Sequence, residues 1–121
     1  MVMFINKGYT QMEIRKIKLE DVEFVIDILQ DISSFYPPKS KFKNIYQNFS
    51  NQYNVDGYVF VEENEIVGYG SINYETKIRG GKIGHIEDII VKKEHRNKNI
   101  GITIIDTLIQ KLNKKNVLKL L

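Results

Sequence analysis

The sequence contains no cysteine, no tryptophan and no alanine, and it has only two prolines among its 121 residues. Without cysteine, disulfide scaffolds, Cys-ligated zinc, iron–sulfur clusters and thiol catalysis are all excluded. No apolar run reaches the roughly eighteen residues that a membrane-spanning helix needs, and the opening segment MVMFINKGYTQ lacks the apolar core of a signal peptide. We therefore expect a cytoplasmic protein without a membrane span.

Length and composition indicate one folded domain over residues 1–121, because 42% of the residues are hydrophobic and 27% are charged, as is typical of globular proteins. The formal net charge is only +3. This excess is compatible with a nucleic-acid surface or with an anionic small ligand, and it does not distinguish between them. No strand face interleaves aromatic residues with Arg or Lys, which disfavours a nucleic-acid-binding domain of the RRM or OB kind.

The first half of the chain predicts one strand followed by two helices. Residues 12–18 alternate in polarity and indicate a strand. Glu20 and Asp21 then open an amphipathic helix of about three turns. Its apolar face is expected to consist of Val22, Val25, Ile26, Leu29 and Ile32. A more polar helix is predicted over 40–50, after the loop that contains Pro37 and Pro38, and its apolar positions are Phe42, Ile45, Tyr46 and Phe49.

The second half predicts a hairpin and a β-α-β unit. Residues 58–61 and 66–74 have the two-residue period of antiparallel strands around a turn at 62–65. A strand over 84–91, a helix over 100–113 and a strand from 117 to 121 follow, so the last two strands should be parallel neighbours. The helix is expected to bury Ile104, Ile105, Leu108, Ile109 and Leu112. The predicted fold class is α+β, with a mixed, mostly antiparallel sheet flanked by helices and the strand 84–91 at its centre.

The basic loop over 94–101 joins the carboxyl end of a strand to the start of a helix. Free backbone N–H groups and the helix dipole make such a junction a site for an anion such as phosphate. Arg96 and Lys98 add positive charge, and Gly101 permits close approach of a ligand to the first turn. The alternative is a solvated basic loop with a glycine near the helix start.

The adjacent acids Glu87 and Asp88 are a second candidate feature. On a regular strand they point to opposite faces, so at most one faces the core, where an acid needs a ligand or partner. The alternative is a solvent-exposed acid pair. His85-Ile86-Glu87 resembles the H-x-E of zinc deaminases, but that site needs two cysteines, and no metal-ligand spacing joins His85 to His95. We predict no metal site, and no Ser-hydrolase, Walker A or Rossmann motif occurs.

Residues 84–101, GHIEDIIVKKEHRNKNIG, resemble the central motif of the GNAT acetyltransferases. In detail they resemble the glucosamine 6-phosphate N-acetyltransferases, in which a G-H-I-E-D strand precedes an R/Q-G-x-G-x-G loop. The likeness runs from Met12 to the end of the chain. It includes the segments 14–16, 20–21, 75–78, 104–108 and 116–119.

The resemblance implies a GNAT-like fold and transfer of acetyl from acetyl-CoA to glucosamine 6-phosphate, a step toward UDP-N-acetylglucosamine, by a cytoplasmic homodimer without a metal. It places the pantetheine arm and the acetyl carbonyl on the backbone of Ile89, Ile90 and Val91. It places the pyrophosphate on Asn97, Lys98, Asn99, Ile100, Gly101 and Ile102, beside Arg96. It assigns the amino sugar to Ser33, Lys77, Glu87 and Asp88.

The sequence departs from the family pattern at three places. Asn97 and Asn99 replace two loop glycines, which is tolerable because asparagine accepts a positive φ better than other residues with a side chain. The loop at 79–81 is two residues shorter and lacks the family's histidine. The chain ends within the fifth strand of the family's fold, before the tyrosine that protonates the departing thiolate.

These departures leave the general acid unassigned, with Tyr69 and Tyr74 as the first candidates. The expected single GNAT domain lacks the usual C-terminal segment, so we expect aggregation or dimerisation and a turnover below that of a longer homologue. The alternative function is a catalytically inactive, truncated GNAT remnant that folds, pairs or only binds CoA.

Overall fold

The protein is described by a computed structural model over residues 3–7, 10–114 and 119–120. Its strands are β1 (Met3–Lys7), β2 (Thr10–Lys16), β3 (Val55–Glu62), β4 (Glu65–Thr76), β5 (Lys82–Val91) and β6 (Lys119–Leu120). Its α-helices are α1 (Val22–Leu29), α2 (Phe42–Ser50) and α3 (Ile100–Lys114), and short 3-10 turns lie at Leu19–Asp21, Lys39–Lys41 and Lys93–His95. No helix of this described part is long and apolar enough to cross a bilayer.

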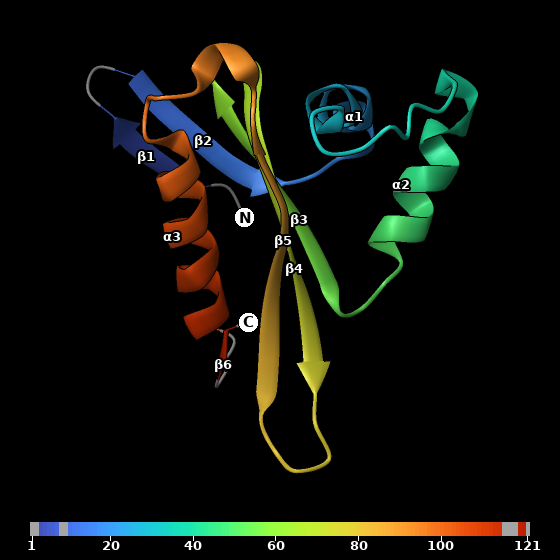
Figure 1. The fold of residues 1–121 in the computed structure, drawn as a ribbon, viewed down its shortest axis with the longest axis vertical. Coiled ribbons are helices and arrows are strands. Elements are labelled where there is room, and N and C mark those ends of the chain that lie inside the picture. The colour runs from blue at the N-terminus through green and yellow to red at the C-terminus, as the bar shows by residue number, and fades with distance from the viewer. Residues whose placement is uncertain (1–2, 8–9, 115–118, 121) are drawn as a thin grey trace.

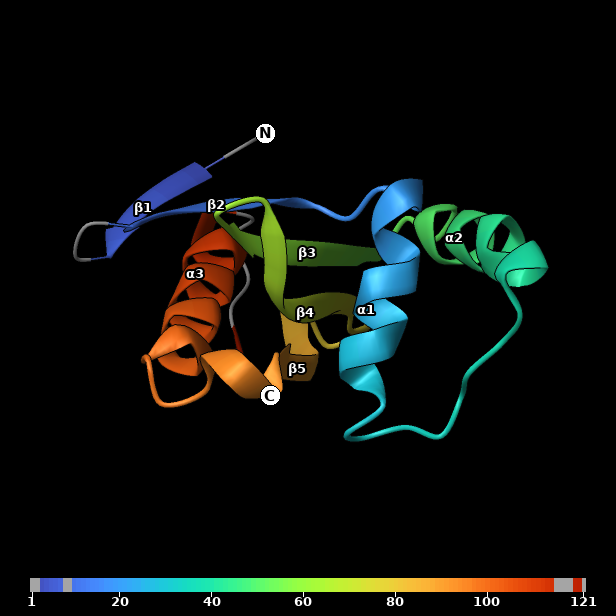
Figure 2. The ribbon, with the colours of Figure 1, turned by 90° about the horizontal axis from the view of Figure 1, so that it is seen from above.

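The strands of these residues form one sheet in the order β1-β2-β3-β4-β5-β6, and this order confirms the predicted α+β class. Neighbours from β1 to β5 are antiparallel, whereas β6 runs parallel to β5. Helix α3 covers one face of the sheet, and α1 and α2 lie on the other (Figures 1 and 2). The predicted hairpin and the parallel last pair are therefore confirmed.

Two apolar clusters, one on each face, explain the unbroken apolar run of β3. Tyr58 and Phe60 pack on the α3 side, whereas Val59 and Val61 pack on the α1 side. A strand that is covered on both faces needs apolar residues at every position, so the alternation of a half-exposed strand is lost. The α3 helix contributes Ile100, Ile104, Leu108 and Leu112 to its cluster. Gly84 lets this helix approach β5, because a Cβ there would overlap the Leu112 side chain.

Several boundaries differ from the sequence predictions. Helix α1 ends at Leu29 and not near Ile32, which is exposed in the connection to α2. The Gln30 side-chain amide donates to the carbonyls of Ile26 (3.0 Å) and Phe35 (2.8 Å), so it turns the chain away from the helix. Strand β1 was not predicted, and β2 begins and ends two residues earlier than expected. Ile105 is exposed, contrary to the prediction.

The predicted last strand lies partly outside the described residues. Of residues 117–121, only Lys119 and Leu120 are described, and they pair with Ile83 and Gly84.

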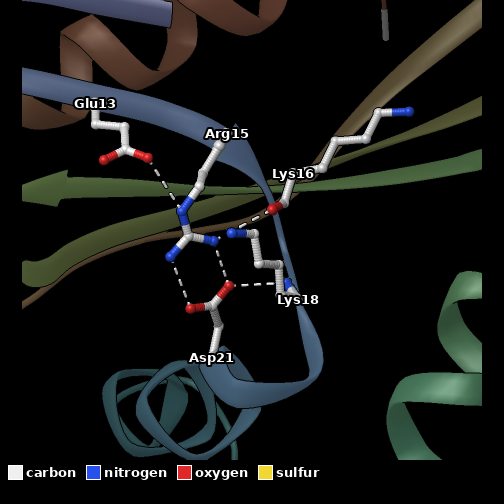
Figure 3. A network of polar contacts seen from close by, with 5 residues as sticks. All are labelled: Glu13, Arg15, Lys16, Lys18 and Asp21. Atoms are coloured by element: carbon white, nitrogen blue, oxygen red, sulfur yellow. Dashed lines mark hydrogen bonds and ion pairs between the residues drawn. The ribbon is translucent and has the colours of Figure 1, made fainter. Parts of the chain in front are cut away.

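A buried ion pair fixes the start of α1 to β2 (Figure 3). The guanidinium of Arg15 donates from its two terminal nitrogens to the Asp21 carboxylate over 2.6 and 2.9 Å, and the Lys18 backbone N–H donates to the same carboxylate over 2.8 Å. Glu13 pairs with Arg15 Nε at 3.3 Å. Asp21 is only 3% exposed, and its hydrogen bond raises the pKa of Arg15. The pair therefore sets the position from which α1 crosses the sheet.

Candidate acetyl-CoA and acceptor site

A β-bulge interrupts β5 at Asp88 and Ile89. Ser71 of β4 opposes Glu87 and Tyr69 opposes Ile90, so the two intervening residues of β5 face Gly70 alone. Asp88 takes the extra position with a φ of 53°, a left-handed conformation that is unusual for a residue with a side chain. A bulge re-aims backbone groups and is frequent beside active sites. Here it lies where the resemblance places the acetyl carbonyl.

Because of the bulge, the prediction that Glu87 and Asp88 point to opposite faces of a regular strand is wrong. The extra residue breaks the two-residue period, and both acids are exposed rather than divided between solvent and core. The described part of β6 pairs only with Ile83 and Gly84. Within the described chain, the edge of β5 from Ile89 to Val91 therefore has no parallel strand beside it. Such an edge can accept a ligand as it would accept a strand.

The loop after β5 forms the start of α3 and has the geometry of an anion cradle. The Asn99 carbonyl accepts the Thr103 backbone N–H at 3.1 Å, so Asn99 caps the helix. The N–H groups of Ile100, Gly101 and Ile102 precede the first intrahelical donor and need partners from outside the helix. A cavity of about 290 Å³ lies there. Its lining residues are Val91, His95, Arg96, Asn97, Asn99, Ile100, Gly101 and Ile102.

Gly101 leaves space that the protein itself does not fill. A Cβ at this position would meet only the Val91 side chain, at 3.8 Å, which is an ordinary van der Waals contact. At Gly84, by contrast, the neighbouring helix occupies that space. The fold therefore does not require a glycine at 101, whereas a ligand that approaches the helix N-terminus would.

Asn97 and Asn99 have positive φ angles of 67° and 62°, which confirms that they adopt the left-handed conformation expected of the glycines they replace. We predict that Asn97→Gly preserves or slightly raises the free energy of unfolding, whereas Asn97→Val lowers it by about 1–2 kcal/mol because a β-branched residue resists this φ. Urea unfolding measures the difference. Asn48→Val on α2 is a control with an ordinary φ, expected within about 0.5 kcal/mol of the parent protein. Equal losses for the two valine variants would contradict the prediction.

Arg96 ties the loop to the α1–α2 connection. Its guanidinium pairs with Asp31, and its Nε donates to the Val91 carbonyl at 3.2 Å. The positive charge that was expected beside the phosphates is thus shared with a carboxylate. Arg96 also lines the cavity. Its contacts within the protein hold the loop against the end of β5 and against Asp31.

A second set of contacts, which the sequence analysis missed, ties the same loop to the β3–β4 turn. Glu65 lies at the start of β4. One of its carboxylate oxygens accepts a hydrogen bond from the Lys92 ammonium, and the other lies 2.9 Å from His95 Nε2. The hydrogen bond from Lys92, followed by that from His95, lowers the pKa of Glu65. His95 Nδ1 lies 3.2 Å from the Lys98 ammonium. No local pattern indicates these contacts, because Glu65 is 27 residues from Lys92 and 30 from His95.

A mostly apolar cavity of about 200 Å³ lies between the sheet and helices α1 and α2. The Asp88 carboxylate and the Tyr69 ring reach it from the bulge region, and Phe35 reaches it from the α1–α2 connection. Burial, followed by the charge of Asp88, raises the pKa of Tyr69, so this hydroxyl stays protonated near neutral pH. Tyr74 instead packs against the cluster on the α3 face, and its hydroxyl donates to Asp56 at 3.3 Å.

The predicted acceptor residues are distributed over two regions. Asp88 lies at the apolar cavity, and Ser33 accepts the backbone N–H of Phe35, a lining residue of that cavity, at 3.1 Å. Lys77 follows β4 and pairs with Glu75 at 3.2 Å. It lies in the β4–β5 connection, at the opposite end of β5 from the anion cradle (Figure 1). One copy of the chain does not bring Lys77 to the loop.

Among the described residues, no three His, Asp or Glu side chains gather as ligands of a metal ion.

Comparison with known proteins agrees with this geometry. The Acetyltransferase (GNAT) family profile matches residues 22–121. Glucosamine 6-phosphate N-acetyltransferase of Candida albicans is 30% identical over an alignment of 114 residues, and the match covers 88% of this chain and 73% of that protein. Glucosamine 6-phosphate N-acetyltransferase 1 of Dictyostelium discoideum is 50% identical over 52 residues, 41% of this chain, and the match spans only 33% of that relative.

The fold also matches solved structures. The crystal structure of glucosamine-6-phosphate N-acetyltransferase from Arabidopsis thaliana superposes with a TM-score of 0.80 at 24% identity, over 91% of this chain and 80% of that one. At this identity the match supports the fold alone. The family profile, which covers most of the chain, and the relative from Candida albicans show that this chain belongs to the GNAT family of acetyltransferases.

Proposed function

We propose that the chain, as a single GNAT domain over residues 1–121, transfers the acetyl group of acetyl-CoA to the amine of glucosamine 6-phosphate. The observation that carries the proposal is the cradle at the start of α3, where unpaired N–H groups and the open space at Gly101 adjoin the bulged end of β5. Two relatives that carry this activity in their names support the choice of acceptor.

The cradle fits the anionic end of acetyl-CoA, which supplies an activated thioester when bound. Backbone N–H groups of Ile100, Gly101 and Ile102 would hold the pyrophosphate, as helix N-termini hold phosphates in general. The backbone edge from Ile89 to Val91 would bind the pantetheine arm in the manner of an added strand. A backbone N–H re-aimed by the bulge would polarise the thioester carbonyl, because fixed donors stabilise developing negative charge.

The acceptor amine would enter from the α1–α2 side. The exposed carboxylates of Glu87 and Asp88 can bind a cationic amine, and Asp88 faces the cavity that Tyr69 shares. Among the described residues Tyr69 is our candidate proton donor, since its hydroxyl stays protonated near neutral pH and Tyr74 is directed to Asp56 on the other face. Lys77 would reach the sugar phosphate only from a second copy, so the proposal includes a homodimer.

Release of CoA thiol from acetyl-CoA tests this function in purified protein. We expect release that depends on glucosamine 6-phosphate and is slower by at least about tenfold with glucosamine, which lacks the phosphate. N-acetylglucosamine 6-phosphate, whose amine is blocked, should give only the background rate. Binding of acetyl-CoA without release of CoA thiol on addition of glucosamine 6-phosphate would contradict the proposed acceptor. Faster release with an unphosphorylated amine would identify that amine as the acceptor instead.

A further inference from the structure

Lys98 is not among the residues that line the cavity at the start of α3. Its neighbours Asn97 and Asn99 do line this cavity. The Lys98 ammonium instead lies 3.2 Å from His95 Nδ1, and His95 itself lines the cavity. Lys98 is thus held by a neighbouring side chain that does line the cavity.

The hydrogen-bond chain fixes the tautomer of His95. A lysine ammonium has only donors, so His95 Nδ1 must accept from Lys98. His95 Nε2 must then carry the proton and donate to the Glu65 carboxylate, 2.9 Å away, which has only acceptors when ionised. Only an imidazole with its single proton on Nε2 can make both contacts at once, with Glu65 and Lys98 on its two sides.

Protonation of His95 is incompatible with its contact to Lys98. An imidazolium carries a proton on both nitrogens, so Nδ1 can no longer accept from Lys98 and repels its charge. The Glu65 contact survives, because a carboxylate accepts from either form. The charged groups that face His95 are Glu65 from β4 and Lys98 from the loop. Lys92 reaches it through Glu65, and Arg96 is directed to Asp31.

We propose that His95 is a positioning residue that couples the anion site to pH. In its neutral form it holds Lys98 aside, and in its protonated form it releases Lys98 to the pyrophosphate and adds a second positive charge at the cavity wall. This inference rests on the proposed function, because it takes the cradle to be the acyl-CoA site. Glu65 keeps the imidazole at the wall in both states.

Calorimetric titration with dephospho-CoA between pH 8 and pH 5.5 tests the coupling. This probe retains the pyrophosphate but lacks the phosphate monoester, whose own ionisation near pH 6 would obscure the result. We expect the parent protein to bind it about fivefold more tightly at pH 5.5, since two cations then face the pyrophosphate. His95→Gln should bind with less than about a twofold change over the same range.

The chain offers a matched control in its other histidine. His85 Nε2 lies 3.0 Å from Glu75, a similar His–Glu pair at the opposite end of β5. His85→Gln should keep the pH dependence of the parent protein. An unchanged pH dependence in His95→Gln, or its loss in His85→Gln, would overturn the proposal. Binding of acetyl-CoA but not of dephospho-CoA by the parent protein would overturn the proposal and leave the site intact. Binding of neither compound at any pH would contradict the proposed site as well.

An NMR measurement tests the relay without any ligand. Long-range ¹H–¹⁵N spectra of the histidine rings at pH 8 should show His95 with its proton on Nε2, and Lys98→Met should weaken this preference. A proton on Nδ1 would contradict the relay. Lys98→Met should also reduce the pH effect on dephospho-CoA binding to about twofold, because only the imidazolium charge then remains.

Discussion

Gly101→Leu is expected to abolish detectable acetyl-CoA binding while the free protein keeps or gains thermal stability. Gly101 is the second residue of α3, and a side chain at that position meets only Val91 in the protein. Replacement of a glycine inside a helix stabilises it by up to about 1 kcal/mol. The same side chain would project into the space where the pyrophosphate meets the helix N–H groups, so the ligand would lose its donors.

Graded variants make this prediction sharper. Gly101→Ala should weaken binding less than leucine, because its single methyl group excludes less volume. Asp106→Leu adds a leucine at an exposed position of the same helix and should leave binding unchanged. Isothermal titration gives the affinities, and thermal unfolding shows that each variant folds. Retention of the parent affinity in Gly101→Leu would exclude the cradle as the acetyl-CoA site.

Asp21→Ala should produce the largest loss of stability among the substitutions considered. It leaves the Arg15 guanidinium, which is mostly buried, without its bidentate partner, and it removes the acceptor of the Lys18 backbone N–H. Breaking a buried ion pair from one side costs about 3–5 kcal/mol. For a domain of this size that corresponds to a fall in melting temperature of roughly 10 °C or more.

Two comparison variants separate the ion pair from helix effects. Glu20→Ala removes an adjacent but exposed acid and should change the free energy of unfolding by no more than about 0.5 kcal/mol. Adding Arg15→Met to Asp21→Ala should recover part of the loss, since the mostly buried guanidinium that keeps only its Glu13 contact is then gone. Urea unfolding with all three proteins measures these differences. A cost for Asp21→Ala no larger than that for Glu20→Ala would show that the pair does not hold α1.

Local sequence features determined much of the site. The motif over 84–101 is contiguous, so the order strand, loop and helix N-terminus can be predicted without long-range contacts. The left-handed conformations of Asn97 and Asn99 follow from residue type, because asparagine is tolerated there when glycine is absent. The β3–β4 hairpin and the parallel last pair likewise follow from hydrophobic periodicity and from the handedness of β-α-β connections.

Other features depend on contacts that the hydrophobic pattern does not reveal. The bulge at Asp88 exists because β4 and β5 pair with one residue more on β5, a register that no pattern within β5 reveals. Helix α1 ended early through the contacts of Gln30 with the following loop, although the apolar spacing continued to Ile32. Strand β1 forms only against the edge of β2. The register of β4 against β5 is a tertiary feature, whereas the Gln30 bonds and the β1–β2 hairpin are local contacts that hydrophobic periodicity does not reveal.

The sequence by itself determined the family resemblance, the element order after β2 and the cradle of backbone donors, because each is encoded by consecutive residues with strong local preferences. Only the tertiary structure decided which side chains stand around that cradle. Glu65 reaches His95, and Asp31 reaches Arg96, across separations of 30 and 65 residues. Such pairs form because packing of the sheet and helices brings their elements together, and exposed polar side chains carry no periodic signal of their partners.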